Sequence, residues 1–128
     1  MTLLINLNNI NTHSVRMSLS GSINSDTADI LDGEIARLLD HAISTLVLDF
    51  SDITYISSAG VGVIMKAKTS LTRRKGDLAM INLQPQVKKV FEIIRLLPTL
   101  NVFESVQEMD EYLGKIQRNT IDEDSESL

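Results

Sequence analysis

Residues 46–64 read LVLDFSDITYISSAGVGVI, in which an apolar strand runs into a helix through two adjacent serines. The segment Leu46–Phe50 has apolar residues at successive positions, as expected of a strand covered on both faces. Ser57 and Ser58 then open the helix. A hydroxyl at such a junction can cap the helix, attack an electrophile or receive a phosphoryl group. The choice among these three roles is the main functional question.

Two strands and a helix are predicted upstream of this segment. Leu3–Leu7 is a short strand candidate, and after an Asn-rich turn Val15–Ser20 alternates apolar and polar residues, which is typical of a half-exposed strand. Gly21 is expected to end that strand. Ser25 or Asp26 is expected to cap a helix. The apolar residues of that helix recur at helical spacing at Leu31, Ile35, Leu38, Leu39 and Ala42.

Three helices and two strands are predicted downstream. A helix from about Ser58 to Arg74 precedes a fully buried strand at Leu78–Ile81. Pro85 stands at the first position of the next helix, and Val102–Phe103 makes a short strand. Ser105–Glu108 is a capping box for a last helix. The apolar positions expected to be buried by these helices are Val61, Ile64, Met65, Leu71, Val87, Val90, Phe91, Ile94, Leu97, Val106, Met109, Leu113 and Ile116.

This order of elements predicts a single α/β domain. Helices that alternate with strands imply right-handed crossovers and parallel neighbours, while the two opening strands can form a hairpin. We therefore predict a mixed, mostly parallel sheet of about four to five strands with four helices, spanning residues 1–117. Residues 118–128 contain one base and four acids, a net charge of −3, and are predicted to be a disordered acidic tail.

Composition excludes several classes of function. The chain has 128 residues, of which 43% are hydrophobic and 23% charged, which is ordinary for a soluble globular protein. We find no apolar run of membrane-spanning length and no signal peptide, so we expect a cytoplasmic protein without a membrane partner. No cysteine is present, which excludes disulfides, thiolate metal sites and a cysteine nucleophile. The net charge of −5 argues against direct binding of nucleic acid.

A hydrolytic serine is not supported by the sequence. A nucleophile elbow reads Gly-x-Ser-x-Gly, and an acid and then a histidine follow it in the chain. The segment Ile56–Gly60 lacks the leading glycine, and His13 and His41 both precede the serines. We expect each histidine to be structural or solvated, and therefore no catalytic residues.

Metal or nucleotide binding has only weak support. Asp49 and Asp52 flank the strand end, where ligands gather in parallel sheets, and could hold Mg²⁺ or accept a phosphoryl group. The favoured interpretation is that Asp49 terminates the strand and Asp52 caps a turn. Gly60 and Gly62 lack the third glycine or lysine of a nucleotide motif, and closer helix packing explains them better. We expect no metal and no cofactor, with a small nucleotide-binding or hydrolytic domain using Asp49, Asp52 and Ser58 as the alternative.

A serine that accepts a phosphoryl group fits this junction. The first turn of a helix offers unpaired backbone N–H groups and the positive end of the dipole, so a phosphate is tolerated there. Phosphorylation adds about −1.5 to −2 charges, which can eject a docked partner. The alternative, that Ser57 or Ser58 only caps the helix, stays open at this point.

The segment DFSDITYISSAGVGV, residues 49–63, resembles the signature of STAS domains, the family of bacterial anti-sigma factor antagonists. That signature is a hydrophobic strand, then Asp-Leu-Ser-x-Val, an aromatic residue, and Asp-Ser-Ser-Gly-Leu-Gly. Gly21 followed by Ile23 is similar to the family's turn before its first helix, and the resemblance covers nearly the whole chain. When the motifs are aligned on Gly60, the family's phosphoacceptor falls on Ser58. Ser57, our second choice, stands where the family has Asp.

The resemblance implies a regulatory protein rather than an enzyme. Unphosphorylated, it would bind an ATP-dependent serine kinase that is also the anti-sigma factor; phosphorylated on Ser58, it would be released, and a PP2C-type serine phosphatase would reset it. The alternative within the family is an unphosphorylated scaffold or subunit of another assembly, such as a lipid-transport complex. The expected partner-binding residues are Ser57, Ser58, Ala59, Gly60, Val61, Gly62, Lys66, Thr69 and Arg73.

Overall fold

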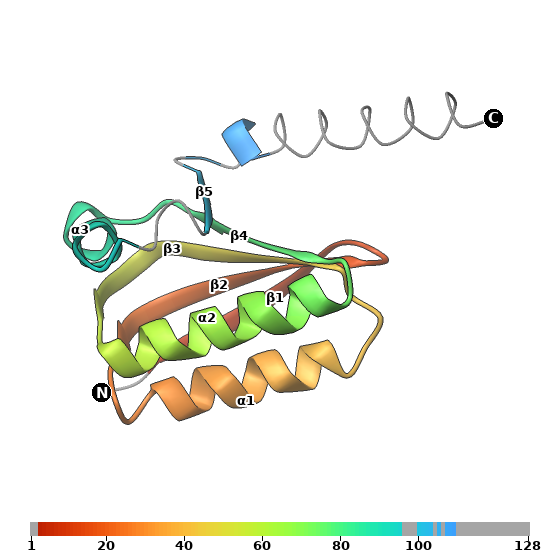
Figure 1. Cartoon of the computed structure of the whole chain (residues 1–128), viewed down its shortest axis with the longest axis horizontal. Coiled ribbons are helices and arrows are strands. Elements are labelled where there is room, and N and C mark those ends of the chain that lie inside the picture. The colour runs from red at the N-terminus through yellow and green to blue at the C-terminus, as the bar shows by residue number, and fades with distance from the viewer. Residues whose placement is uncertain (1–2, 96–99, 104, 106, 110–128) are drawn as a thin grey trace.

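The computed structural model describes residues 3–95, 100–103, 105 and 107–109. These residues form one five-stranded sheet with strand order β1-β2-β3-β4-β5 (Figure 1). β1 is antiparallel to β2, and the other neighbouring strands are parallel, which confirms the predicted mixed, mostly parallel sheet. The elements are β1 (Leu4–Asn11), β2 (Ser14–Ile23), α1 (Ala28–Leu39), β3 (Thr45–Ile56), α2 (Ser58–Arg73), β4 (Asp77–Ile81), α3 (Pro85–Ile93) and β5 (Asn101–Phe103).

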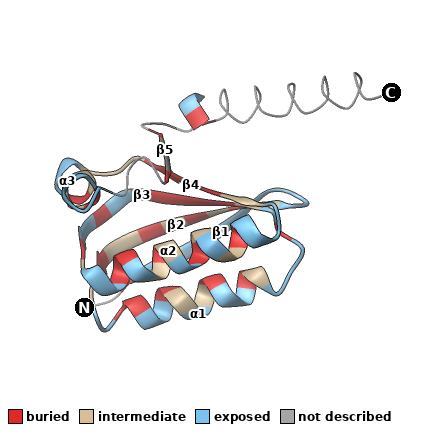
Figure 2. Ribbon diagram, viewed as in Figure 1, coloured by how far each residue is buried: buried red, intermediate tan, exposed pale blue. Residues whose placement is uncertain are grey.

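Apolar side chains cover both faces of the central strands. Leu46 and Leu48 of β3 belong to the main core with α1 and α2, which lie side by side on one face of the sheet (Figure 1). Val47 points to the opposite face, where it clusters with Phe103 and Met109. Figure 2 shows the result as buried residues along the middle of the sheet and on the inner sides of the two helices. The predicted fully buried strand at residues 78–81 is confirmed by β4.

The N-terminal hairpin is longer than predicted. The Asn-rich segment is not a turn, because β1 continues to Asn11 with a bulge between Asn9 and Asn11. Gly21 does not end β2 either. Its positive φ of 118°, which a side chain would make unfavourable, lets the strand continue through an irregular register to Ile23.

The start of α1 differs from the prediction. The N-cap residue of α1 is Thr27, and not Ser25 or Asp26. The carbonyl oxygen of Ser22 accepts a hydrogen bond of 2.7 Å from the Thr27 hydroxyl. The Asn24 side-chain oxygen accepts from the backbone N–H groups of Asp26 and Thr27. This network ties the helix start to the end of β2. The helix ends at Leu39, so that Ala42, predicted to be buried on it, lies beyond it and is exposed.

The C-terminal predictions are confirmed only in part. α3 begins with Pro85 and buries Val87 and Phe91, whereas Ile94 follows the helix and is exposed. The Ser105 Oγ accepts a hydrogen bond of 3.1 Å from the Glu108 backbone N–H, and residues 107–109 are helical, as the capping box predicts. The remaining predictions, at Leu97, Val106, Leu113, Ile116 and the tail 118–128, lie outside the described residues.

Candidate functional site

Ser57 follows the last residue of β3 and is the N-cap of α2. Its backbone N–H donates to the Ile23 carbonyl at 2.8 Å, which holds the junction against the end of β2. Its backbone is extended, with φ −93° and ψ 172°, and its Oγ accepts a hydrogen bond of 3.3 Å from the Gly60 N–H. Its carbonyl accepts the first helical hydrogen bond, from Val61 at 3.0 Å. Ser57 is therefore engaged in building the helix.

Ser58 is the first residue of α2 and is exposed. Among the described residues its hydroxyl makes no hydrogen bond, in contrast to that of Ser57. The backbone N–H groups of Ser58 and Ala59 have no carbonyl one turn earlier to bond, and the first turn holds no acidic residue. The Ser58 hydroxyl thus lies at the positive end of the helix dipole. This geometry gives the two serines different roles, since Ser57 caps the helix and the Ser58 hydroxyl is exposed.

Gly60 sets how closely this turn approaches the sheet. A Cβ atom on Gly60 would lie 2.5 Å from Cγ2 of Ile23 and 2.8 Å from Cγ1 of Ile56. Such distances do not occur between real atoms, so only glycine allows the contact. The packing interpretation is therefore correct for Gly60. It is wrong for Gly62, which is exposed and has nothing within 4 Å of its Cβ position.

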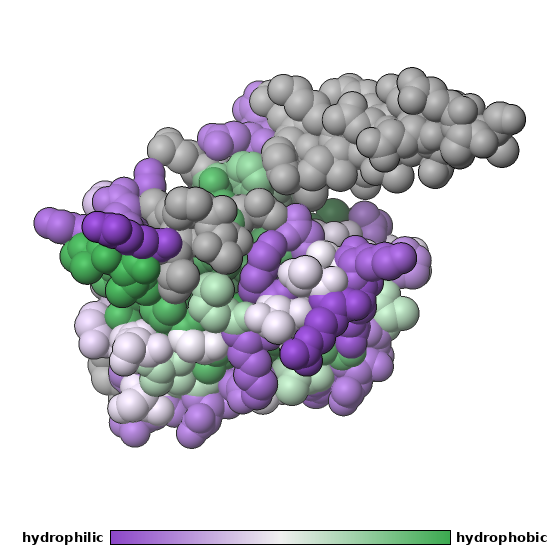
Figure 3. All heavy atoms as spheres, viewed as in Figure 1, coloured by the Kyte–Doolittle hydropathy of each residue, from purple (hydrophilic) through white to green (hydrophobic). Residues whose placement is uncertain are grey.

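The surface over the start of α2 is neither strongly charged nor strongly apolar. Figure 3 shows it as mostly pale, with deeper purple farther along the helix. Ala59 and Gly62 are exposed beside Ser58, whereas Gly60 and Val61 are buried. The structure thus places those two predicted contact residues in the core, because they face the sheet.

The basic end of the predicted surface is built jointly by α2 and α1. Lys66 and Thr69 are exposed, and so is Arg73 at the last position of α2. The Lys66 Nζ lies 3.2 Å from the Asp32 carboxylate of α1, and the Thr69 hydroxyl donates to the Met65 carbonyl at 3.0 Å. Asp32 is a member of this surface that sequence reasoning missed, because only the packing of α1 beside α2 brings it there.

The histidines lie at the far end of the molecule from Ser58. The His13 carbonyl accepts from the Thr45 N–H at the start of β3, and Ser58 follows the end of that strand. Twelve strand residues separate the two positions, a distance of roughly 35–40 Å. The His41 carbonyl accepts from Arg74, which follows the last residue of α2. The geometry therefore rules out a triad between Ser58 and either histidine.

Asp49 and Asp52 both lie within β3, so, contrary to the predictions, Asp49 does not end the strand and Asp52 does not cap a turn. Asp49 is a structural carboxylate. Its Oδ1 accepts from the Ser51 N–H at 3.0 Å and from Asn82 at 3.2 Å, while its Oδ2 pairs with Arg16. Burial raises the pKa of the Asp49 carboxyl, but the hydrogen bonds from Arg16, Ser51 and Asn82 lower it by more, so this pKa lies below its usual value. Protein groups occupy both oxygens, which leaves Asp49 unsuited to hold a metal or a nucleotide.

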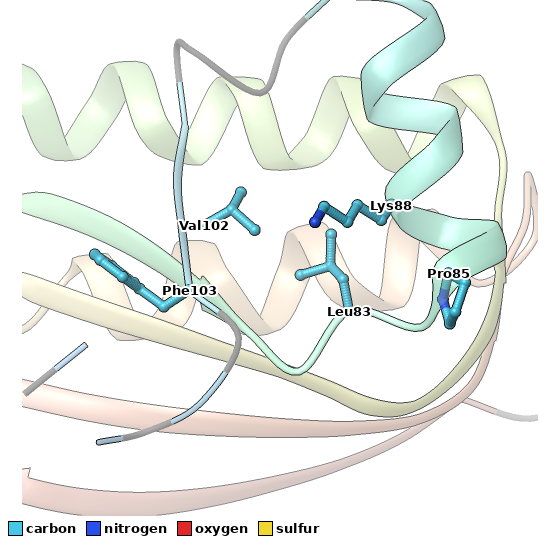
Figure 4. Close-up of a pocket in the computed structure, with 5 residues that line it drawn as sticks. All are labelled: Leu83, Pro85, Lys88, Val102 and Phe103. Atoms are coloured by element: carbon cyan, nitrogen blue, oxygen red, sulfur yellow. The ribbon is translucent and has the colours of Figure 1, made fainter. Parts of the chain in front are cut away.

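Metal binding has no other support in the part of the chain that the structure describes. Within the described residues, no three His, Cys, Asp or Glu side chains are grouped so as to bind a metal ion. An open pocket of about 360 Å³ lies between β5 and α3, lined by Leu83, Pro85, Lys88, Val102 and Phe103 (Figure 4). None of the predicted site residues lines it. None of the described helices combines the length and apolar character needed to cross a membrane.

The described residues form a small α/β domain that displays an exposed serine hydroxyl at the start of a helix. The STAS domain family model matches residues 5–109, and the chain belongs to this family. The predicted family membership is thus confirmed.

Individual relatives agree with this assignment. The chain is 37% identical over 86 residues to BtrV of Bordetella bronchiseptica, a protein assigned as an anti-sigma factor antagonist; the match covers 65% of this chain and 74% of that one. The solved structure of the anti-sigma factor antagonist SpoIIAA in its unphosphorylated form has a TM-score of 0.75 at 21% identity and covers 87% of this chain and 97% of that one. The phosphorylated form of the Bacillus cell fate determinant SpoIIAA gives a TM-score of 0.67 at 20% identity, covering 85% and 99%.

Proposed function

We propose that this protein is an anti-sigma factor antagonist that acts by partner switching. Unphosphorylated, it binds an ATP-dependent serine kinase that is also the anti-sigma factor, and phosphorylation of Ser58 releases it. A PP2C-type serine phosphatase restores the binding form. The protein itself is a cytoplasmic binding partner and kinase substrate, not an enzyme.

The exposed, unbonded hydroxyl of Ser58 at the first position of α2 carries this proposal. Its neighbour Ser57 already supplies the cap, so modification of Ser58 costs the helix none of its hydrogen bonds. The relatives named as anti-sigma factor antagonists support the choice of partner, and SpoIIAA has been solved in both unphosphorylated and phosphorylated forms.

The switch follows from the charge of the phosphate. Ala59 and Gly62 are exposed beside Ser58, and neither carries charge. A phosphoryl group places about −1.5 to −2 charges there. A partner that packs closely on this surface must then desolvate that charge, whereas the free protein keeps it in water beside the helix dipole. Phosphorylation therefore weakens binding without unfolding the protein.

Binding to the cognate kinase tests this proposal. Ser58→Asp should lower the affinity for the cognate kinase by at least about 100-fold, a change of roughly 2.7 kcal/mol. Ser58→Ala should bind like the unmodified protein and resist phosphorylation by the kinase with ATP. Ser57→Ala is the matched control: it should lose about 1 kcal/mol of stability with its cap and still be phosphorylated. Equal binding by Ser58→Asp and Ser58→Ala would refute the switch.

A further inference from the structure

β1 forms an edge of the sheet and has neither the charged residues nor the proline that commonly protect edge strands. It is eight residues long, and within the described residues it pairs only with β2. Its sequence, LINLNNIN, contains no charged residue and no proline. Edge strands commonly carry such residues because their outward backbone N–H and C=O groups otherwise recruit another strand. Only the bulge between Asn9 and Asn11 interrupts this edge, near its end.

Three of the exposed large hydrophobic side chains lie on β1. Leu4 is 60% exposed, Ile10 is 51% exposed and Leu7 is 37% exposed. Leu7 stands opposite the buried Met17 of β2, so it is the outermost member of a row that belongs to the core. A strand added beyond β1 would cover Leu7 and extend that row.

The sequence of β1 identifies what the added strand is. Antiparallel pairing about a two-fold axis at Leu7 brings residues equally distant from Leu7 face to face. Leu7 then meets Leu7 of the second copy, Leu4 meets Ile10, and Asn6 meets Asn8. Of the four pairings, three match apolar with apolar or amide with amide, and only Ile5 opposite Asn9 mixes the two. Such self-complementarity is what a two-fold interface requires.

Charge does not oppose this occupant at the contact itself. The whole chain has a net charge of −5, so two copies repel each other over most of their surfaces. β1 places no charge at the contact, so the pairing brings no like charges together. We propose that two copies of this protein associate through antiparallel β1 strands centred on Leu7, forming one continuous ten-stranded sheet. One edge strand per copy buries less than the roughly 800 Å² per partner of a stable interface, so this dimer forms in a concentration-dependent way.

Single cysteines test the contact and its register, because the chain has none of its own. Under mild oxidation, Leu7→Cys should cross-link to itself. Leu4→Cys and Ile10→Cys should cross-link when the two variants are mixed and not when each is alone. Ile93→Cys on α3, where the native side chain is 69% exposed, is the control and should not cross-link specifically. Absence of the Leu7→Cys dimer, or equal yields at all positions, would overturn the proposal.

Charge reversal at the two-fold axis gives a second measurement. Leu7→Glu and Leu7→Lys should each sediment as monomers, because like charges face each other, and a mixture of the two should restore the dimer. Ile93→Glu should leave the dimer intact, and circular dichroism checks the folding of each variant. A native protein that sediments as a monomer up to about 1 mM, the weak limit of specific association, would equally overturn the proposal. Neither experiment depends on phosphorylation of Ser58, so both separate this inference from the proposed function.

Discussion

Alanine at Gly60 and at Gly62 should change stability in opposite directions, although the two glycines lie two residues apart on α2. Each substitution removes the entropic disadvantage of glycine in a helix, a gain of about 1 kcal/mol in the interior and less in the first turn. What differs is the space around the new methyl group. At Gly62 nothing lies within 4 Å, so we expect the free energy of unfolding to rise by about 0.5–1 kcal/mol.

At Gly60 the new methyl group has no room. Its carbon would lie 2.5 Å from Ile23 and 2.8 Å from Ile56, which is roughly 1 Å too close. Ile23 is 0% exposed and Ile56 is 3% exposed, so neither can turn into solvent. The start of α2 must move instead, and overpacking of this kind costs about 1–3 kcal/mol. The helix gain offsets part of that cost, which leaves Gly60→Ala destabilised by about 1–2 kcal/mol.

Urea unfolding followed by far-ultraviolet circular dichroism measures both variants, since the chain has no tryptophan to report by fluorescence. We expect midpoints on either side of the native value, with about 1.5–3 kcal/mol between the two alanine variants. A Gly60→Ala protein as stable as Gly62→Ala would refute the reasoning, because it would mean that α2 does not rest on Ile23 and Ile56.

Two further predictions concern polar contacts. Asp49→Asn should lower the stability by about 1.5–3 kcal/mol at pH 7, because Arg16 loses its partner. The pKa of Asp49 is below its usual value, so the native carboxylate stabilises the fold above about pH 4, the unfolded pKa, and this stability is lost as the pH falls through the folded pKa. The difference in the free energy of unfolding between the native protein and Asp49→Asn should therefore shrink in acid. A difference that stays constant into acid would contradict this. Arg74→Ala should cost about 1–2 kcal/mol, measured in the same way, because its guanidinium donates to the carbonyls of Leu39, His41 and Ile43 at and beyond the end of α1. The neighbouring Arg73→Ala should change stability by less than about 0.5 kcal/mol. Equal losses of stability at the two positions would show that these hydrogen bonds of Arg74 do not stabilise the fold.

Local patterns in the sequence predicted the elements well. The alternation of Val15, Met17 and Leu19 marks the buried face of β2, and Pro85 does begin α3. These signals depend on neighbours within a few residues, which the sequence displays directly. The mostly parallel pairing and the opening hairpin also followed, because the alternation of helices and strands admits few arrangements.

Contacts between distant residues were not predictable in this way. Arg16 and Asp49 lie 33 positions apart, and parallel pairing of β2 with β3 is what brings them together. Thr27 takes the N-cap position of α1, which was predicted for Ser25 or Asp26, because the Ser22 carbonyl is within reach of its hydroxyl. Gly62 could not be told from Gly60, because the difference lies in which face of α2 meets the sheet.

A phosphorylation switch has to change a surface while it leaves the fold intact, and the two serines divide those demands. Ser57 caps α2 through Gly60, so a modification there would compete with the helix for its own hydrogen bond. Ser58 lies one residue later, where its hydroxyl is exposed and has no hydrogen-bond partner among the described residues. An added negative charge at that position gains about 0.3–1 kcal/mol from the helix dipole, so the modified protein should be at least as stable as the unmodified one. Any binding free energy that phosphorylation removed would then be lost from the contact with the partner, and this supports Ser58 over Ser57 as the proposed acceptor.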